Sequence, residues 1–149
     1  AHGLRTRMPY CFAEHKYPGV PEIALREIEA GQAFSVGPTE ILPLRVMHGK
    51  LPILGYRIGS MAYITDMLTM PEESYEQLHG LKLLFVNALR IKPHYTHQTL
   101  EQALQAAQRI GAEETYLIHM SHHFGLHEPM SQQLSPHVHL AYDGQEILF

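Results

Sequence analysis

Two apolar runs that enclose an amphipathic helix constrain the fold of this sequence most. Residues 81–86 (LKLLFV) form a nearly continuous apolar run, which is typical of a strand covered on both faces. Residues 115–118 form a second run of this kind. Between them, one helical face of residues 99–110 carries Leu100, Ala103, Leu104, Ala107 and Ile110. With strands expected before this unit and a hairpin after it, the order of elements predicts an α/β layered fold with a mixed sheet.

Several shorter elements flank this unit. Four strands are expected before it, with a tight turn at Gly59–Ser60: residues 34–36, 41–47, 53–58 and 61–65. Residues 24–28 fit either a strand or a helical turn, and a short helix is expected within residues 70–80. Thr99 and Gln102 have the spacing of a capping box, and Gly111 ends the long helix. Residues 138–142 and 146–149 predict a closing hairpin around Asp143–Gly144.

The length of 149 residues favours one domain, residues 1–149, with a sizeable core. Residues 8–22 carry three prolines and one glycine and are too long for an ordinary connection, so we expect a covering loop. The formal net charge of −4 provides no basic field for nucleic acid. No apolar run approaches the roughly 18 residues that a membrane span needs. Because Cys11 is the only cysteine, no intrachain disulfide exists, and we expect a reducing, cytoplasmic setting.

Three polar residues follow apolar runs: His48, Asp66 and His119. Side chains at strand ends converge on a shared crevice in α/β proteins, and this set could bind a metal ion. Each residue also has a plainer interpretation. His48 fits a turn, Asp66 fits a helix N-cap or Asx-turn, and the cluster of His119, His122 and His123 can arise by chance. Histidine is nevertheless abundant, with 12 residues against 11 lysines and arginines together.

The segment PHYTH places His94 and His97 after the strand 81–86, at the edge where α/β sheets bind ligands. A histidine there could donate a proton to a leaving oxygen or hold a phosphate. Arg90 precedes the loop and could pair bidentately with phosphate or carboxylate. The alternatives are ordinary loop residues for the histidines and a surface salt bridge for Arg90.

These motifs together resemble a known family. The ordered series H-G, Y-I-T-D, A-L-R, P-H-x-x-H, H-x-S-H and A-Y-D-G is similar to the C-terminal half of metallo-β-lactamase-fold hydrolases. Within that superfamily the sequence most resembles the phosphoribosyl cyclic phosphate phosphodiesterases and, less closely, the tRNA 3′-end processing nucleases. The resemblance implies half of an αββα sandwich with a mixed sheet.

The resemblance also implies roles for individual residues. His48 and His119 would each hold a metal ion, and Asp66 would bridge the two ions. His97 matches a histidine near the scissile phosphate, and His122 and Arg90 match positions to which we assign phosphate contact. The implied cofactors are two divalent metal ions, zinc or manganese, since histidine and aspartate accept both. Asn87 stands where many relatives have an acidic residue.

One part of the family pattern is absent from this sequence. The HxHxDH motif, which supplies further ligands from the first half of the fold, does not occur. His48, Asp66 and His119 alone are too few ligands for a tight binuclear site. We therefore expect a missing N-terminal half or a second copy of the chain to complete the fold. The whole protein is then expected to be a binuclear phosphodiesterase acting on a small cyclic or nucleotide-like phosphodiester. The alternative is a catalytically incomplete fragment or binding module.

Overall fold

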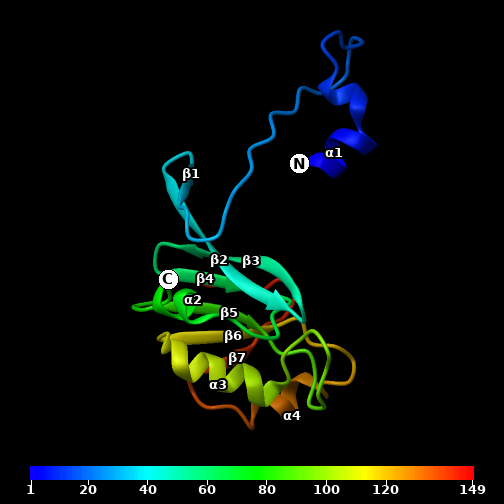
Figure 1. The fold of residues 1–149 in the computed structure, drawn as a ribbon. Helices are drawn as coiled ribbons and strands as arrows, with labels where there is room; N and C mark the ends of the chain where they lie inside the picture. The colour runs from blue at the N-terminus through cyan, green and yellow to red at the C-terminus, as the bar shows by residue number, and fades with distance from the viewer.

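The computed structural model describes all 149 residues, and its body is one seven-stranded sheet (Figure 1). The strands lie side by side in chain order: β1 (Phe34–Val36), β2 (Thr39–His48), β3 (Leu51–Ile58), β4 (Met61–Ile64), β5 (Leu83–Asn87), β6 (Glu114–Ile118) and β7 (Val138–Leu140). The helices are α1 (His2–Arg7), the 3₁₀ helix η1 (Pro9–Phe12), α2 (Glu72–Glu76), α3 (Leu100–Ile110) and α4 (His127–Ser131).

The sheet is mixed, as the sequence predicts. Strands β1 to β4 pair in antiparallel fashion, and β4 to β7 pair in parallel. The turn at Gly59–Ser60 joins β3 to β4, and the expected α/β unit appears as β5, α3 and β6. The predicted capping box at Thr99 and the stop at Gly111 are both confirmed; Gly111 has a left-handed backbone with φ of 70°.

The hydrophobic core lies on one face of the sheet. Buried side chains from β2, β4, β5, β6 and β7 form one cluster with the apolar stripe of α3. Side chains from α2 and α4, including Tyr75 and Met130, pack against the same cluster. Arg109 of α3 also bonds Glu72 of α2, and its guanidinium carbon lies 3.7 Å from the Tyr75 ring centroid. All three helices of the body therefore cover the same face.

The opposite face carries a row of rings and no helix of the body. Tyr63, Phe85, Tyr116 and His139 are register partners across β4 to β7. Their ring centroids lie 5.8 Å, 5.7 Å and 4.8 Å apart in that order. Such cross-strand pairs stabilise a sheet, yet Tyr63 remains 44% exposed. This row is called the open face below.

Two sequence predictions about short elements are wrong. Residues 24–28 and 146–149 form neither strand nor helix, so the closing hairpin is absent, although Asp143 and Gly144 do make a turn. The hairpin is absent because β7 pairs in parallel with β6 instead of with the residues that follow it. Leu148, after the turn, is fully exposed. The short helix α4 was not predicted, because its five residues have too little periodicity to reveal a helix.

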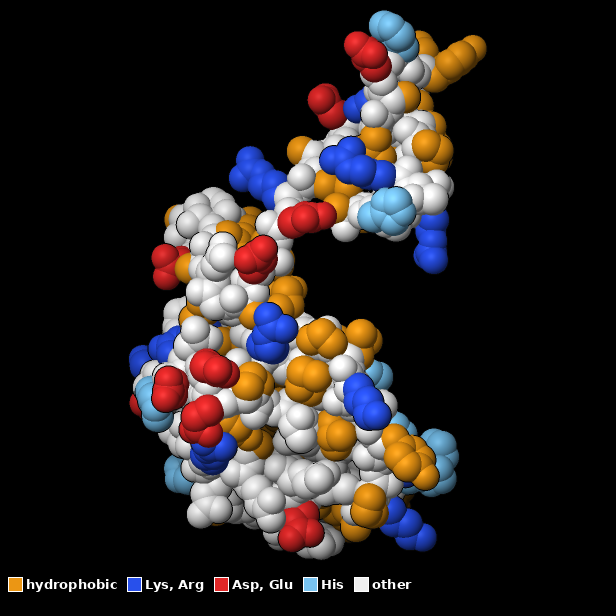
Figure 2. Space-filling view, viewed as in Figure 1, with side chains coloured by type: hydrophobic (Ala, Val, Ile, Leu, Met, Phe, Trp, Pro, Cys, Tyr) orange, Lys and Arg blue, Asp and Glu red, His pale blue; other side chains and the backbone are white.

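The N-terminal segment stands away from the sheet in Figures 1 and 2. It contains α1 and η1, which contact each other, and an extended stretch leads from them to β1. Figure 2 shows charged side chains of both signs on this segment. A covering role for residues 8–22 remains a prediction. None of the helices has the length and apolar content that crossing a bilayer requires.

We predict that Thr99→Ala destabilises the protein by about 1 kcal/mol, the usual cost of losing a side-chain N-cap. The Thr99 hydroxyl accepts from the backbone N–H of Gln102, and the Gln102 side chain accepts from the N–H of Thr99. Chemical unfolding measures the loss. Thr6→Ala, in the exposed helix α1, is the matched control; an equal loss in both variants would contradict the capping contribution.

Candidate functional site

The candidate residues meet at one edge of the sheet because of strand direction. Strand β3 runs antiparallel to both β2 and β4, so β2 and β4 point the same way, and β5 and β6 run parallel to β4. His48 is the last residue of β2, and Asp66 follows β4 closely. His97 lies in the loop after β5, and His119 directly follows β6. Four ends of similarly directed strands thus converge at one edge.

Three of these side chains form a compact group of potential metal ligands. His48, Asp66 and His97 each offer a ligand atom, and the three atoms lie within 4.8 Å of one another. His97 Nε2 donates to Asp66 Oδ1 over 3.0 Å, and His119 Nε2 lies 3.3 Å from the same oxygen. One carboxylate oxygen of Asp66 therefore contacts both His97 and His119.

The His97 ring occupies the centre of the cluster. Its centroid lies 4.6 Å from that of His48 in an edge-on arrangement and 4.9 Å from that of His119, on which it stacks. His94 is also close, with 3.2 Å between the two Nδ1 atoms. The Thr96 hydroxyl lies 2.8 Å from His97 Nδ1 and holds this ring from the side opposite Asp66. His97 is only 9% exposed, so its orientation is well defined by these contacts.

Backbone strain is concentrated in this cluster. Asp66 and His119 are the two non-glycine residues with positive φ, at 58° and 63°. A left-handed backbone costs a residue with a Cβ roughly 1–2 kcal/mol. Such strain persists where the surroundings hold it in place, and it gathers at functional sites. Both residues are among the three that the sequence singled out as ligands.

The electrostatics of the cluster favour an ionised Asp66. Partial burial opposes ionisation, but hydrogen bonds from His97 and Thr65 and the charges of His119 and His97 outweigh it. The pKa of the Asp66 carboxyl is therefore lowered from its ordinary value. Desolvation, followed by the charge of Arg90 and the neighbouring histidines, lowers the pKa of His94. Both shifts favour forms that can donate a lone pair to a cation.

The structure decides one of the alternative interpretations. Asp66 does not cap a helix, because α2 begins at Glu72 and its N-cap is Pro71. His48 does lie beside a turn, but its ring also faces His97. Gly49 explains how these two features combine. Its φ of +63° turns the chain, and its lack of a side chain lets Tyr95 and Thr96 approach closely.

Of the three residues predicted to bind substrate, one lies in the cluster and two lie outside it. His94 belongs to the cluster. Arg90 instead folds its own loop, because its Nε donates to Lys92 O over 3.1 Å and its terminal nitrogen donates to Pro93 O over 2.6 Å. His122 is exposed, and its ring contacts that of His123 with centroids 3.8 Å apart. No contact of His122 with the cluster is present, so its role remains a prediction.

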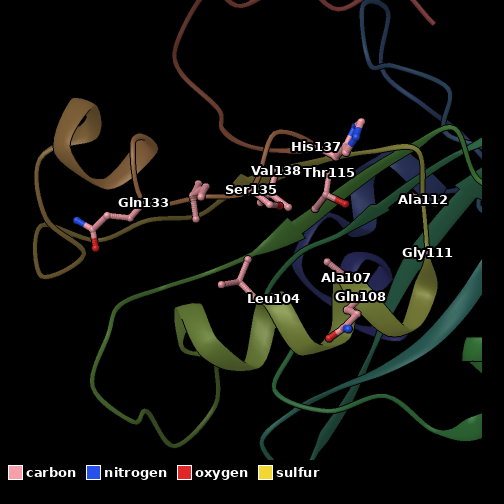
Figure 3. A pocket seen from close by; sticks show the side chains of 11 residues that line it. Leu104, Ala107, Gln108, Gly111, Ala112, Thr115, Gln133, Ser135, His137 and Val138 are labelled. Atoms are coloured by element: carbon pink, nitrogen blue, oxygen red, sulfur yellow. The ribbon is translucent and has the colours of Figure 1, made fainter.

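Two hollows deserve comparison with the cluster. Arg90, Ile91, Lys92 and His123 line a cavity of about 310 Å³ beside the loop that carries His94 and His97. A second cavity, of about 440 Å³, lies between α3 and the segment leading into β7 (Figure 3). Its lining is largely uncharged, and its histidine, His137, is bonded to Glu114. The first cavity, with its basic side chains, therefore suits an anionic ligand better.

Sequence reasoning missed Thr96 and Gly49 as contributors to the site. Thr96 lies inside the PHYTH segment, where a hydroxyl beside two histidines gave no periodic or charge signal. Gly49 follows His48 in the H-G motif, but its packing against Thr96 depends on a loop 47 positions later. Contacts between loops of different strands leave no mark on local sequence.

Comparisons with known proteins show the family and the fold of this chain. The family model of the beta-lactamase superfamily domain matches residues 1–120. A protein of Porphyromonas gingivalis named octanoyltransferase is 46% identical over 146 residues, which are 97% of this chain but 30% of that protein. A new diphosphatase from the PhnP family has a similar structure, with a TM-score of 0.84 and 35% identity. That alignment covers 97% of this chain and 52% of the diphosphatase chain.

More distant structures share the fold. The metallo-beta-lactamase-fold protein YhfI of Bacillus subtilis has a TM-score of 0.63 at 22% identity, over 79% of this chain and 53% of its own. Human tRNase Z, short form, has a TM-score of 0.59 at 19% identity, over 75% of this chain and 42% of its own. This chain thus spans about half, or less, of each relative.

We predict that Gly49→Ala disturbs the site more than Gly59→Ala does. Both glycines have φ near +60°, so each variant should lose about 1–2 kcal/mol to a left-handed alanine. At Gly49 an added Cβ would lie 3.1 Å from Thr96 Cγ2 and 3.3 Å from Tyr95 O, whereas at Gly59 it meets nothing within 4 Å. Overpacking should add about 1 kcal/mol or more at Gly49 alone.

Chemical unfolding of both variants measures this difference. Equal losses of unfolding free energy would show that the packing of Gly49 against the His97 loop carries no stability.

Proposed function

Because the chain belongs to the beta-lactamase superfamily domain family and carries a metallo-β-lactamase fold, we propose that the protein is a metal-dependent hydrolase of small phosphodiesters. The observation that carries the proposal is the convergence of His48, Asp66, His97 and His119 at one sheet edge, with Asp66 contacting two of the histidines. Two divalent ions, zinc or manganese, are the proposed cofactors. Imidazole and carboxylate donors suit both metals.

The residues present fit such a site. We assign His48, Asp66 and His119 to holding metal, with Asp66 shared between ions. The lowered pKa of the Asp66 carboxyl favours the ionised form that binds a cation. Its left-handed backbone also fits that role, because such strain gathers at functional sites. A bound divalent ion would polarise a phosphoryl oxygen as a Lewis acid.

His97 is proposed to carry a proton rather than to hold metal. Its Nε2 donates to Asp66, and its Nδ1 lies beside Thr96 and His94, so both ring nitrogens are engaged by protein groups. When Asp66 holds metal, the Nε2–H of His97 would be the group that gives its proton to a leaving oxygen at the same edge. His97→Ala should accordingly retain metal while losing activity.

A small anionic substrate is supported by the surroundings. The guanidinium of Arg90 lies close enough to His94 to lower its pKa, and Lys92 shares a cavity of about 310 Å³ with Arg90. These charges suit a phosphate group, while the formal net charge of −4 opposes a long polyanion such as RNA. The diphosphatase similarity also favours a phosphate ester or anhydride. His122 is proposed to contact phosphate from the loop after His119.

The name octanoyltransferase does not support acyl transfer at this site. The similar region is 30% of that protein, so the name can describe a part that this chain does not share.

We further propose that additional polypeptide covers the open face, either as a missing N-terminal half or as a second copy of the chain. A partly exposed row of aromatic side chains, with Tyr63 44% exposed, is a typical contact for a second layer. The diphosphatase chain, about half of which aligns with this one, has enough further sequence to provide that layer in cis. The same additional part would provide the further ligands that a binuclear site needs.

The second candidate function is a catalytically incomplete fragment or binding module. The observation that favours it is the small number of ligands in this chain, with His48, Asp66 and His97 as the compact set. Metal content separates the two candidates. About two ions per full-length protein support the hydrolase, whereas less than one ion would support the incomplete module.

We predict that Asp66→Asn lowers metal affinity and phosphodiesterase activity by more than about 100-fold, since residues that merely orient ligands already account for about 10–100-fold. The fold should persist, because the Asp66 side chain is 38% exposed and its ion pairs are solvent-screened. Calorimetric zinc titration and hydrolysis of a chromogenic phosphodiester measure the two effects. Asp143→Asn, at the chain's other aspartate, is the control; retained activity in Asp66→Asn would rule out Asp66 as the shared ligand.

We predict that the 149-residue chain by itself associates through the open face and that Tyr63→Lys reduces this association. A charge on an exposed aromatic row opposes pairing of two such faces. Sedimentation velocity measures the mass. Leu126→Lys is the matched control, because Leu126 is 78% exposed but lies before α4 rather than on the row. A wild-type chain that remains monomeric at high concentration would contradict self-association.

A further inference from the structure

Asn87 makes an unusual pair of hydrogen bonds at the end of β5. Its side chain is fully buried. The N–H of Met67 donates to Asn87 Oδ1 over 2.7 Å, and Asn87 Nδ2 donates to Met67 O over 2.9 Å. The β4–β5 ladder ends at Ile64 and Val86, one residue before Asn87. The amide side chain therefore continues the pairing between the two segments after their backbones have separated.

Met67 connects Asn87 to two candidate site residues. It directly follows Asp66, whose φ is 58°. The same carbonyl, Met67 O, accepts from the backbone N–H of Gln98 over 3.0 Å, and Gln98 directly follows His97. The Met67 peptide groups thus bond both to Asn87 and to the loop of His97. This arrangement joins the residues next to Asp66 and His97, whose side chains bond each other over 3.0 Å.

We propose that Asn87 is a positioning residue that fixes the strained backbone after Asp66 and, through the Met67 carbonyl, the placement of His97. The proposal deepens the proposed function and rests on it for its metal readout. The side-chain hydrogen bonds of Asn87 go to Met67 and not to the candidate ligands. Asn87 bonds both the N–H and the C=O of Met67 and thereby holds the backbone in the conformation in which Asp66 is left-handed.

The chemistry of the side chain explains why asparagine is suited to this position. An amide offers one acceptor and one donor in a fixed plane, which matches the N–H and C=O of Met67. Leucine has a similar size but leaves the buried N–H of Met67 without a partner, at the full desolvation cost. An ionised aspartate keeps the acceptor and loses the donor. Asn87→Leu and Asn87→Asp therefore remove different parts of the contact.

Ser74 provides a matched control for burial and hydrogen bonding. It is 3% exposed, and its hydroxyl donates to Arg45 O over 2.8 Å, on the α2 side of β2. Ser74→Ala therefore deletes a buried bond from a side chain to a backbone carbonyl without touching Met67. An effect of Asn87 on the site that exceeds the effect of Ser74→Ala cannot be ascribed to loss of stability alone.

The first measurement is amide hydrogen exchange in the metal-free, full-length protein. We expect exchange at Met67 and Gln98 to be faster in Asn87→Leu than in Ser74→Ala, because both amides depend on the clamped Met67 peptide groups. Asn87→Asp should retain protection at Met67, whose N–H keeps its acceptor. Unchanged exchange at both amides in Asn87→Leu would overturn the proposal.

The second measurement is zinc binding by calorimetry. Residues that orient metal ligands typically change affinity about 10–100-fold, and we expect a loss in this range for Asn87→Leu and none for Ser74→Ala. Faster exchange with unchanged zinc affinity would overturn the positioning role. If Asn87→Leu does not fold, Asn87→Ala, which also removes both bonds to Met67, decides: weaker zinc binding than in Ser74→Ala supports the role, and wild-type binding overturns it. A wild-type protein that binds no zinc would overturn the proposed function instead. The exchange result would still test whether Asn87 fixes the Met67 backbone.

Discussion

The common direction of β2, β4, β5 and β6 is the constraint on which the candidate site depends. It brings four strand ends to one edge, but strand direction alone does not hold the loops together. Short backbone hydrogen bonds do so: Met47, beside His48, pairs with Leu68 and Thr69, and Leu89 pairs with both Gln98 and Ser121. The loops that carry His48, Asp66, His97 and His119 are thus bonded to one another before any ligand binds.

The strain at Asp66 and His119 is understandable in this setting. A left-handed residue with a side chain is costly in isolation, and a flexible loop would relax to avoid that cost. Here Asp66 directly precedes Met67, which bonds Asn87 at the end of β5, and His119 lies two residues before Ser121, which bonds Leu89 just after β5. The core cluster beneath, with Val86 and Leu117 fully buried, supplies the rigidity.

Much of the fold and the membership of the cluster could be predicted from sequence, because both depend on local patterns. The run LKLLFV, the stripe of α3 and the cap at Thr99 each express a periodic or pairwise rule, and polar residues at strand ends follow from chain direction. The predictions that were wrong or absent concern partners. Residues 146–149 are β-prone but have no neighbour to pair with, and Asn87 is polar in a buried strand for reasons that lie 20 positions away, at Met67.

Arg90 illustrates the same limit at the level of a single side chain. Its position before the histidine loop predicted phosphate contact, and its donors are instead partly used by the carbonyls of Lys92 and Pro93. The charge remains close to His94, so the residue can influence an anion while also shaping the loop. Sequence indicates that a cation is present at this place, but only the structure shows how many of its donors remain free.

The spacing of the cluster along the chain has a kinetic consequence. His48 and His119 are separated by two strand-to-strand crossovers in the parallel part of the sheet, β4 to β5 and β5 to β6. Contacts between such distant positions form late, because loop closure must precede them. The cluster can therefore exist only after β6 has joined the sheet. Acquisition of an ion held in part by His119 would then report the completion of folding rather than its start.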